Sequence, residues 1–202
     1  MVNKVIKPIF TQTTCPLCSS SINITWQPDD IPFFGEVMYT SAHCKCGFGY
    51  ADTFILTQRE PARYTYKVQS SNDMNVRVIR STSGTIRIPE LEINVEPGPA
   101  SESYISNIEG VLCRIENVLG MVSRWEDEPP ETTQRAHEML KLLEMVKKGE
   151  MEVTLIIEDP LGNSAIVSDK AYKEILPPEV AEDLKTGVII LEKDELLNNF
   201  QN

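Results

Sequence analysis

Two close pairs of cysteines, Cys15-Pro16-Leu17-Cys18 and Cys44-Lys45-Cys46-Gly47, stand near the start of this chain. Pairs of this kind, separated by about 25 residues, offer four soft thiolates to one metal ion, which is the ligand set of a tetrahedral zinc ribbon. The sequence therefore predicts an N-terminal zinc ribbon that binds one structural Zn²⁺.

The second cysteine pair leaves the fourth ligand open. One residue separates Cys44 from Cys46, whereas His43 has the two-residue spacing to Cys46 that a regular knuckle would use. Imidazole and thiolate both bind zinc. The ligands are therefore either Cys15, Cys18, Cys44 and Cys46 or the same set with His43 in place of Cys44. The softness of the thiolate favours the first set.

The cysteines are expected to be reduced. There are five of them, an odd number, and the first seven residues, followed by Pro8, lack the apolar core of a secretory signal peptide. Intracellular thiols at this spacing are usually metal ligands. We therefore expect a cytoplasmic protein without disulfides. The remaining Cys113 lies in a segment with helical periodicity, and we interpret it as a small buried apolar residue rather than a reactive thiol.

The sequence contains little that could support catalysis. A zinc ion with four protein ligands has no open position for water or substrate, so it should stabilise a fold rather than catalyse. The chain has only two histidines, His43 and His137, which are too few for a cupin-like metal site, and it has no phosphate-binding glycine loop. We therefore expect no enzymatic activity.

The charge balance favours protein partners. The chain has 19 basic and 30 acidic residues, a formal net charge of -11, and no run of Lys or Arg in the ribbon. Because phosphate contacts dominate nucleic-acid affinity, DNA or RNA is an unlikely main ligand. The alternative is a zinc-ribbon protein that binds nucleic acid or the transcription machinery, which predicts a basic, aromatic ribbon face. No stretch approaches the roughly 20 apolar residues of a membrane span.

The pattern along the chain predicts a mainly β protein with an inserted helical hairpin. We expect a short arm over residues 1–14, the zinc ribbon over 15–58, a β domain over 59–175 and an acidic tail over 176–202. Strands are predicted where apolar or β-branched residues alternate with polar ones, at 21–26, 33–40, 64–68, 76–80, 85–88, 152–158 and 165–167.

The helical hairpin is predicted over about residues 103–149. Apolar residues at three- and four-residue steps predict one helix over 105–125 and a second over 129–148, which Gly149 ends. We interpret their apolar stripe as core rather than as a binding face. Phe33 and Phe34 in the ribbon are either its small core or an exposed partner-binding patch.

A dense turn signal, Asp159-Pro160-Leu161-Gly162-Asn163-Ser164, separates two predicted strands. The simplest interpretation from composition is a tight hairpin in which Gly162 and Asn163 adopt positive φ.

Several motifs, taken in order, resemble a known family. They are Cys15-Pro16-x-Cys18, Cys46-Gly47, Arg80-Ser81 and the stretches 31–37, 88–91, 108–112 and 158–164. Together they cover about residues 13–168 and are similar to the ZPR-type zinc-finger family. The sequence departs from the family pattern at the irregular second knuckle and at Ser19, where the family usually has glycine.

The resemblance implies a fold and a role. The ribbon should be followed by an A domain, a β domain of double-stranded β-helix type that carries the helical hairpin, in a single-unit member like the shorter archaeal relatives. It implies an adaptor or chaperone that binds a translation elongation GTPase of the elongation factor one-alpha class. The candidate partner-binding residues are Ile31, Pro32, Phe33 and Phe34 in the ribbon and Glu109, Gly110, Asp159, Gly162 and Asn163 in the A domain.

Overall fold

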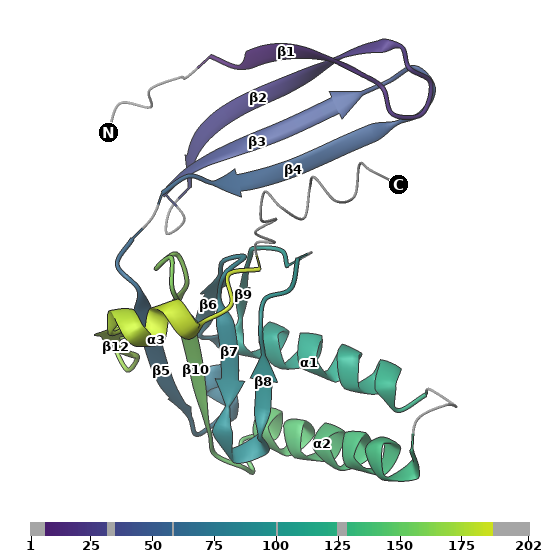
Figure 1. Ribbon diagram of the computed structural model, residues 1–202. Helices are drawn as coiled ribbons and strands as arrows, with labels where there is room; N and C mark the ends of the chain where they lie inside the picture. The colour runs from purple at the N-terminus through teal and green to yellow at the C-terminus, as the bar shows by residue number, and fades with distance from the viewer. Residues whose placement is uncertain (1–6, 32–34, 58, 100, 125–128, 188–202) are drawn as a thin grey trace. The chain divides into compact units, whose positions relative to one another are not determined.

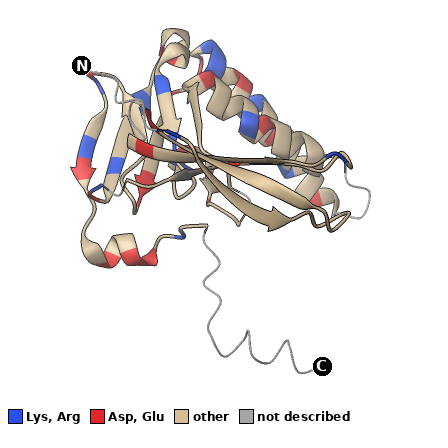
Figure 2. Ribbon diagram, turned by 90° about the horizontal axis from the view of Figure 1, so that it is seen from above, with Lys and Arg blue, Asp and Glu red and all other residues tan. Residues whose placement is uncertain are grey.

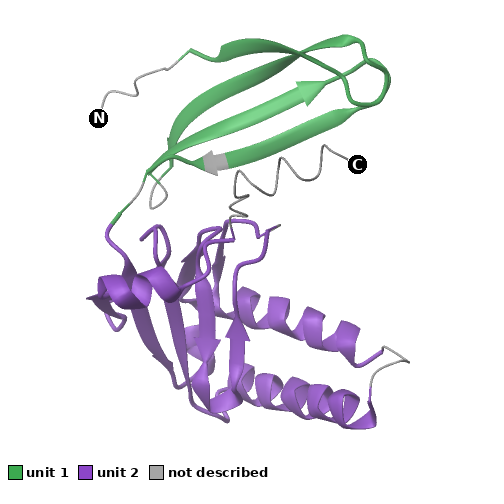
Figure 3. Ribbon diagram, in the orientation of Figure 1, with its two compact units in different colours: residues 1–59 green, residues 60–202 purple. Residues whose placement is uncertain are grey.

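A computed structural model describes residues 7–31, 35–57, 59–99, 101–124 and 129–187. The chain folds as two compact units, unit 1 over residues 1–59 and unit 2 over residues 60–202 (Figure 3). This division lies next to the boundary that the sequence predicts between the zinc ribbon and the β domain.

Unit 1 is a four-stranded antiparallel sheet in the order β1-β2-β3-β4. The strands are β1 (Ile9–Thr14), β2 (Ser21–Ile31), β3 (Gly35–His43) and β4 (Gly49–Ile55). The turn between β1 and β2 and the turn between β3 and β4 lie together at one end of this sheet (Figure 1). These two turns contain the four paired cysteines.

The prediction of an N-terminal arm over residues 1–14 is wrong for residues 9–14. These residues form strand β1, which pairs with β2 from Ile9↔Trp26 to Thr14↔Ser21. Every side chain of this edge strand is exposed, so no alternation of apolar and polar residues marks it. The strand predicted over 21–26 also continues to Ile31, because it pairs with β3 as far as Gly35. Residues 32–34 lie outside the described part of the chain.

Unit 2 contains two antiparallel sheets (Figure 1). The five-stranded sheet has the order β12-β5-β10-β7-β8, with β5 (Ala62–Val68), β7 (Thr85–Ile88), β8 (Ile93–Val95), β10 (Val153–Asp159) and β12 (Tyr172–Ile175). The three-stranded sheet has the order β11-β6-β9, with β6 (Arg77–Arg80), β9 (Tyr104–Asn107) and β11 (Ala165–Val167). The helices are α1 (Ile108–Val122), α2 (Pro130–Lys148) and α3 (Pro178–Asp183).

One hydrophobic core joins the two sheets and the helical hairpin of unit 2. Tyr66 and Leu155 enter it from the larger sheet, Val78 enters from the smaller sheet, and Leu112 and Leu143 enter from α1 and α2. The predicted fold class is therefore confirmed: a four-cysteine zinc ribbon is followed by a double-sheet domain with an inserted helical hairpin. The apolar stripe of the hairpin is core, as the sequence indicates.

The hairpin begins later than the sequence predicts. Residues 104–107 form β9, in which Ile105 pairs with Ile79 and is exposed. Helix α1 then starts at Ile108, because the side chain of Asn107 accepts a hydrogen bond from the Gly110 N–H at 2.8 Å and caps the helix. Helix α2 ends at Gly149, whose φ of +76° is left-handed, as the sequence predicts.

The turn signal at residues 159–164 does not form a hairpin. Strand β10 pairs with β5 and β7, whereas β11 pairs with β6 in the other sheet. The segment is therefore a corner at which the chain crosses from one sheet to the other. Gly162 has the expected positive φ, +68°, but Asn163 is not among the residues with positive φ in the described part of the chain.

The predicted acidic tail begins too early. Leu176 is buried, and its N–H donates a hydrogen bond to the Pro61 carbonyl. Helix α3 follows directly and buries Ala181. Residues 176–183 therefore belong to the packed part of unit 2. No helix in the described residues has the length and apolar character to cross a membrane.

Candidate metal centre

Four cysteine sulfurs cluster at one end of the ribbon sheet. Cys15 and Cys18 come from the first turn and Cys44 and Cys46 from the second, and the four Sγ atoms all lie within 4.8 Å of one another. The Cys15 and Cys46 sulfurs are 3.6 Å apart, and those of Cys18 and Cys44 are 3.5 Å apart. A zinc ion at about 2.3 Å from four sulfurs needs them about 3.8 Å apart, so the cluster fits Zn²⁺. The separations are too long for disulfides, whose S–S bond is about 2.05 Å.

Backbone hydrogen bonds close each turn around its two cysteines. In the first turn, the Cys15 N–H donates to the Ser20 carbonyl at 2.8 Å, and the Ser19 N–H donates to the Cys15 carbonyl at 2.9 Å. In the second turn, the Gly47 N–H donates to the Cys44 carbonyl at 3.0 Å, and Gly47 has a φ of +97° that favours glycine. The second turn is thus a closed loop despite its irregular cysteine spacing.

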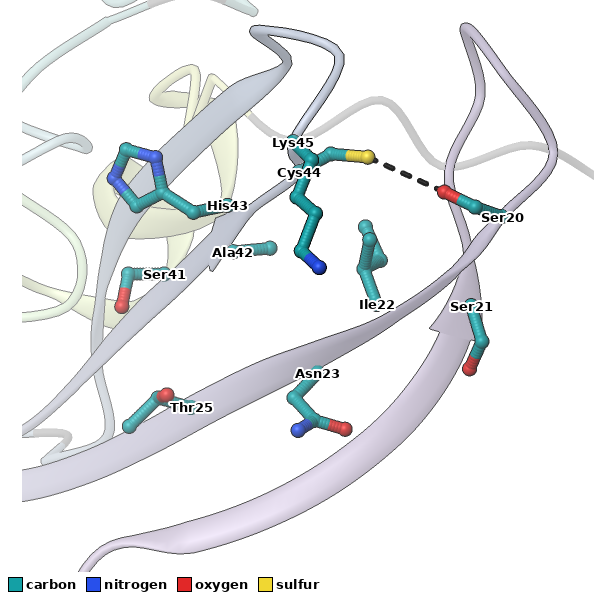
Figure 4. Close-up of a pocket in the computed structure, with 10 residues that line it drawn as sticks. All are labelled: Ser20, Ser21, Ile22, Asn23, Thr25, Ser41, Ala42, His43, Cys44 and Lys45. Carbon is teal, nitrogen blue, oxygen red and sulfur yellow. Dashed lines mark hydrogen bonds between the residues drawn. The ribbon is translucent and has the colours of Figure 1, made fainter.

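The structure selects Cys44 rather than His43 as the fourth ligand. His43 is the last paired residue of β3, opposite Gly49, and successive side chains of a strand point to opposite faces. Cys44 packs against the small core of Cys15, Ile22 and Ala42. The imidazole of His43 is exposed and points away from the Cys44 sulfur (Figure 4).

Two single substitutions test this ligand set. We expect Cys44→Ser to abolish zinc retention during dialysis, because three thiolates and a hydroxyl bind Zn²⁺ far more weakly than four thiolates. His43→Ala should retain one zinc per chain. Zinc content measured by inorganic mass spectrometry distinguishes the variants, and loss of zinc from His43→Ala with retention in Cys44→Ser would contradict the assignment.

Hydrogen-bond donors next to Cys18 and Cys44 favour the thiolate form of these two cysteines. The hydroxyl of Ser20 lies 3.0 Å from the Cys18 sulfur and 3.3 Å from the Cys44 sulfur. It lowers the pKa of the Cys18 thiol, and the backbone N–H of Cys46 together with the Ser20 hydroxyl lowers the pKa of Cys44 to about 6. A lowered pKa favours the thiolate, the form in which Cys18 and Cys44 would bind zinc. No sequence motif points to Ser20, because the contact with Cys44 appears only when the two turns meet.

Ser19 carries backbone strain next to the cluster. Its φ is +58°, in the left-handed region that costs most L-residues about 1–2 kcal/mol and that glycine adopts freely. Ser19→Gly should therefore stabilise the zinc-bound ribbon by about 0.5–1 kcal/mol after the greater chain entropy of glycine is subtracted. Thermal unfolding of the ribbon at saturating zinc measures this change. A destabilised Ser19→Gly ribbon would contradict the strain argument.

The candidate partner-binding residues have diverse environments. Ile31 is half-buried opposite Gly35 at the end of β2, whereas Pro32, Phe33 and Phe34 lie outside the described residues.

At the start of α1, Glu109 is exposed. A Cβ on Gly110 would lie only 2.1 Å from the Ser106 hydroxyl. The absence of a side chain at Gly110 therefore lets the first turn of α1 lie close to Ser106 at the end of β9. Gly110 therefore serves the fold. Cys113, expected to be buried, is half-buried, and burial raises the pKa of its thiol.

Asp159 is the centre of a buried polar cluster. Its carboxylate accepts five hydrogen bonds at 2.6–3.0 Å, from the hydroxyls of Ser81, Ser83 and Ser164 and from the N–H groups of Leu161 and Asn163. These bonds tie the corner at residues 159–164 to the loop between β6 and β7. Asp159 and Asn163 are 1% and 3% exposed, so the folded domain presents little of either residue to a partner. The Asp159 carboxylate is used inside the fold.

Comparison with known proteins identifies relatives of both units. The family model described as the ZPR1 jelly-roll domain matches residues 72–181. A ZPR1-like protein from Methanocaldococcus jannaschii is 43% identical over 181 residues, which cover 88% of this chain and 91% of that protein. A ZPR1-like protein from Pyrococcus horikoshii is 41% identical over 188 residues, covering 90% of this chain and 84% of that protein.

Eukaryotic relatives are longer. The zinc finger chaperone zpr1 of Schizosaccharomyces pombe is 29% identical over 157 residues, which cover 75% of this chain but 34% of the yeast protein. The mouse zinc finger protein ZPR1 is 28% identical over 175 residues, which cover 82% of this chain and 37% of the mouse protein. With its four-cysteine zinc site and its matching jelly-roll domain, the chain belongs to the ZPR1 zinc-finger family.

Proposed function

We propose that this protein is a zinc-binding adaptor or chaperone that binds a translation elongation GTPase of the elongation factor one-alpha class through protein–protein contacts. Membership of the family supports this role, since the fission yeast relative is named a chaperone. The observation that carries the proposal is the surface of the ribbon, which exposes large apolar side chains on a metal-fixed scaffold.

The ribbon exposes apolar residues at its edge and in its first turn. Ile9 and Phe10 in β1 are 57% and 63% exposed, and Leu17 between the zinc ligands Cys15 and Cys18 is 72% exposed. Among the described strands, β1 pairs with β2 alone, so its other edge offers backbone hydrogen-bonding groups. Because zinc holds the turns in place, binding of a partner to this apolar edge costs little conformational entropy.

The distribution of charge supports a protein partner over a nucleic acid. Residues 1–59 contain four basic and four acidic side chains, so the ribbon unit is formally neutral and the whole net charge of -11 belongs to residues 60–202. Lys and Arg lie among Asp and Glu rather than in a separate patch in the view of Figure 2. Neither unit offers the concentrated positive charge that phosphate contacts require.

The metal centre supports a structural and not a catalytic role for zinc. Four thiolates fill the tetrahedral coordination sphere, so the ion keeps no position for a reacting water or substrate. The buried polar cluster around Asp159 is closed by hydrogen bonds from its own corner and from the β6–β7 loop. We therefore infer that the protein acts by binding rather than by chemistry.

Binding to a purified elongation GTPase tests the proposal directly. We expect the zinc-loaded chain to bind the GTPase in calorimetric titrations, which are run with both the GDP and the GTP form. A double variant of the ribbon, Phe10→Ser with Leu17→Ser, should weaken binding tenfold or more, because exposed apolar anchors carry most interface energy.

The matched control is the double variant Tyr172→Ser with Ile175→Ser. These residues of the edge strand β12 in unit 2 are 65% and 61% exposed, similar to the two ribbon residues. It should change affinity less than about threefold, as expected for side chains outside an interface. Recovery of RNA or RNA polymerase with no elongation factor by the zinc-loaded chain would instead favour the transcription-type alternative.

A further inference from the structure

We propose that Ser20 is part of the metal centre, where its single O–H is shared between the sulfurs of Cys18 and Cys44 that would bind zinc, and that it thereby sets zinc affinity and the rate of zinc release. The hydroxyl oxygen lies 3.0 Å from the Cys18 sulfur and 3.3 Å from the Cys44 sulfur. These are donor–acceptor distances suited to sulfur as acceptor. Ser20 is thus a positioning residue, which acts on the metal through its ligands.

The location of Ser20 lets one side chain join both turns of the ribbon. Ser20 is the last residue before β2, and its carbonyl accepts the Cys15 N–H at 2.8 Å. The main chain is therefore fixed independently of the side chain. From this fixed position the hydroxyl reaches Cys18 in its own turn. It also reaches Cys44 in the other turn (Figure 4). Replacing the side chain removes both sulfur contacts while leaving the backbone bond that closes the turn.

The charge of the metal centre explains why such a donor matters. A Zn²⁺ ion with four thiolates carries two net negative charges, and these charges repel one another unless hydrogen bonds or cations offset them. In the pocket view, the ammonium group of Lys45 points away from the Cys44 sulfur, whereas the Ser20 hydroxyl points toward it (Figure 4). The partial positive charge on the hydroxyl hydrogen therefore offsets part of the negative charge on the Cys18 and Cys44 sulfurs.

Solvent reaches this side of the cluster, as it also reaches Cys46. A groove of about 520 Å³, lined by Ser20, Asn23, Ser41, His43, Lys45 and their neighbours, opens onto Cys44. Cys18 is exposed, whereas Cys15 is only 1% exposed. A chelator that removes zinc therefore meets Cys18 and Cys44 more readily than Cys15. The Ser20 hydroxyl lies beside both of these sulfurs, where it can hold them in position for the metal.

Three variants of the full chain separate the hydroxyl from the backbone. Ser20→Ala removes the hydroxyl, Ser20→Thr keeps it, and Ser21→Ala removes the neighbouring exposed hydroxyl as a matched control. Zinc affinity is measured by competition with a coloured chelator, and the release rate is measured from the same reaction at excess chelator. We expect Ser20→Ala to raise the zinc Kd about 10- to 100-fold, Ser20→Thr to stay within about threefold of the parent, and Ser21→Ala to match the parent.

A spectroscopic measurement distinguishes a hydrogen bond to sulfur from a general structural effect. In the Co²⁺-substituted protein, the sulfur-to-cobalt charge-transfer band should move to lower energy in Ser20→Ala, because a thiolate without its hydrogen bond gives up electrons more easily. Ser20→Thr should restore the band. This readout and the zinc affinity need no GTPase, so they stand apart from a test of the proposed function.

The proposal is overturned if Ser20→Ala equals Ser21→Ala in both zinc affinity and charge-transfer energy. It is also overturned if Ser20→Ala and Ser20→Thr fail equally to bind metal, since the hydroxyl is then not the cause. Failure of Ser20→Ala to retain metal, together with normal metal binding by Ser20→Thr, supports it.

Discussion

Removal of zinc is expected to unfold the ribbon while unit 2 stays folded. The ribbon buries few side chains at its metal end, namely Cys15, Ile22 and Ala42, and Cys15 is itself a ligand. Zinc binding contributes about 10–16 kcal/mol to the folding of small zinc modules, far more than this cluster can supply. Unit 2 has a core shared by two sheets and two helices and contains none of the four ligands. Its folding should therefore be independent of the metal.

Amide spectra by two-dimensional NMR show this difference residue by residue. After chelation, signals from residues 7–57 should collapse into the narrow range of an unfolded chain, while those from 60–187 keep their dispersion. All helices in the described residues lie in unit 2, so the far-ultraviolet helix signal should also persist. Cys18→Ser provides the control, since it should give the same spectrum without chelator. Loss of the helix signal on chelation would show that the two units do not fold independently.

Asp159→Ala is expected to destabilise unit 2 by about 3–5 kcal/mol, a loss typical of a disrupted buried polar network. The substitution leaves three hydroxyls and two N–H groups at the corner without the acceptor that they share. Because Asp159 is 1% exposed, water cannot replace the carboxylate without opening the corner. Both the corner and the β6–β7 loop should loosen, since the carboxylate joins them.

Urea unfolding of the zinc-loaded chain, followed by the helix signal, measures this loss. Ser83→Ala removes one of the five donors and should cost about 1 kcal/mol. Glu109→Gln alters an exposed residue of α1 and should change stability by less than about 0.5 kcal/mol. If Asp159→Ala were no less stable than Ser83→Ala, the carboxylate would not be the organising group of the corner.

Much of the fold follows from local patterns in the sequence. The alternation in β5, β7 and β10 and the three- and four-residue periodicity of α1 and α2 reflect burial of one face, so they are readable without coordinates. The same is true of Gly149, where a left-handed φ ends α2. The cysteine spacing likewise contains enough information to predict the metal, because four soft ligands in two tight turns have few other uses.

The missed features depend on contacts between distant residues. Strand β1 has no buried side chain, and only its pairing with β2 makes it a strand. The corner at Asp159 has the composition of a hairpin turn, but the loop between β6 and β7 supplies the partners that direct it to the other sheet. The choice between His43 and Cys44 rests on where β3 ends, which the pairing of His43 with Gly49 decides.

The charge of the chain is distributed unevenly between its two units. A net charge of -11 suggests an acidic protein throughout, whereas residues 1–59 are formally neutral. The ribbon unit itself therefore adds no net charge to the long-range electrostatic field of the chain. Its exposed apolar residues, and not its charge, are the feature on which the proposed partner binding rests.

X-ray absorption at the zinc edge tests the closed four-cysteine centre most directly. The account predicts one zinc per chain with four sulfur neighbours at about 2.3 Å, and the same spectrum for His43→Ala. A nitrogen or oxygen neighbour at about 2.0–2.1 Å, lost in His43→Ala or exchangeable with solvent, would contradict it. That result would give the zinc a different ligand set or an open position.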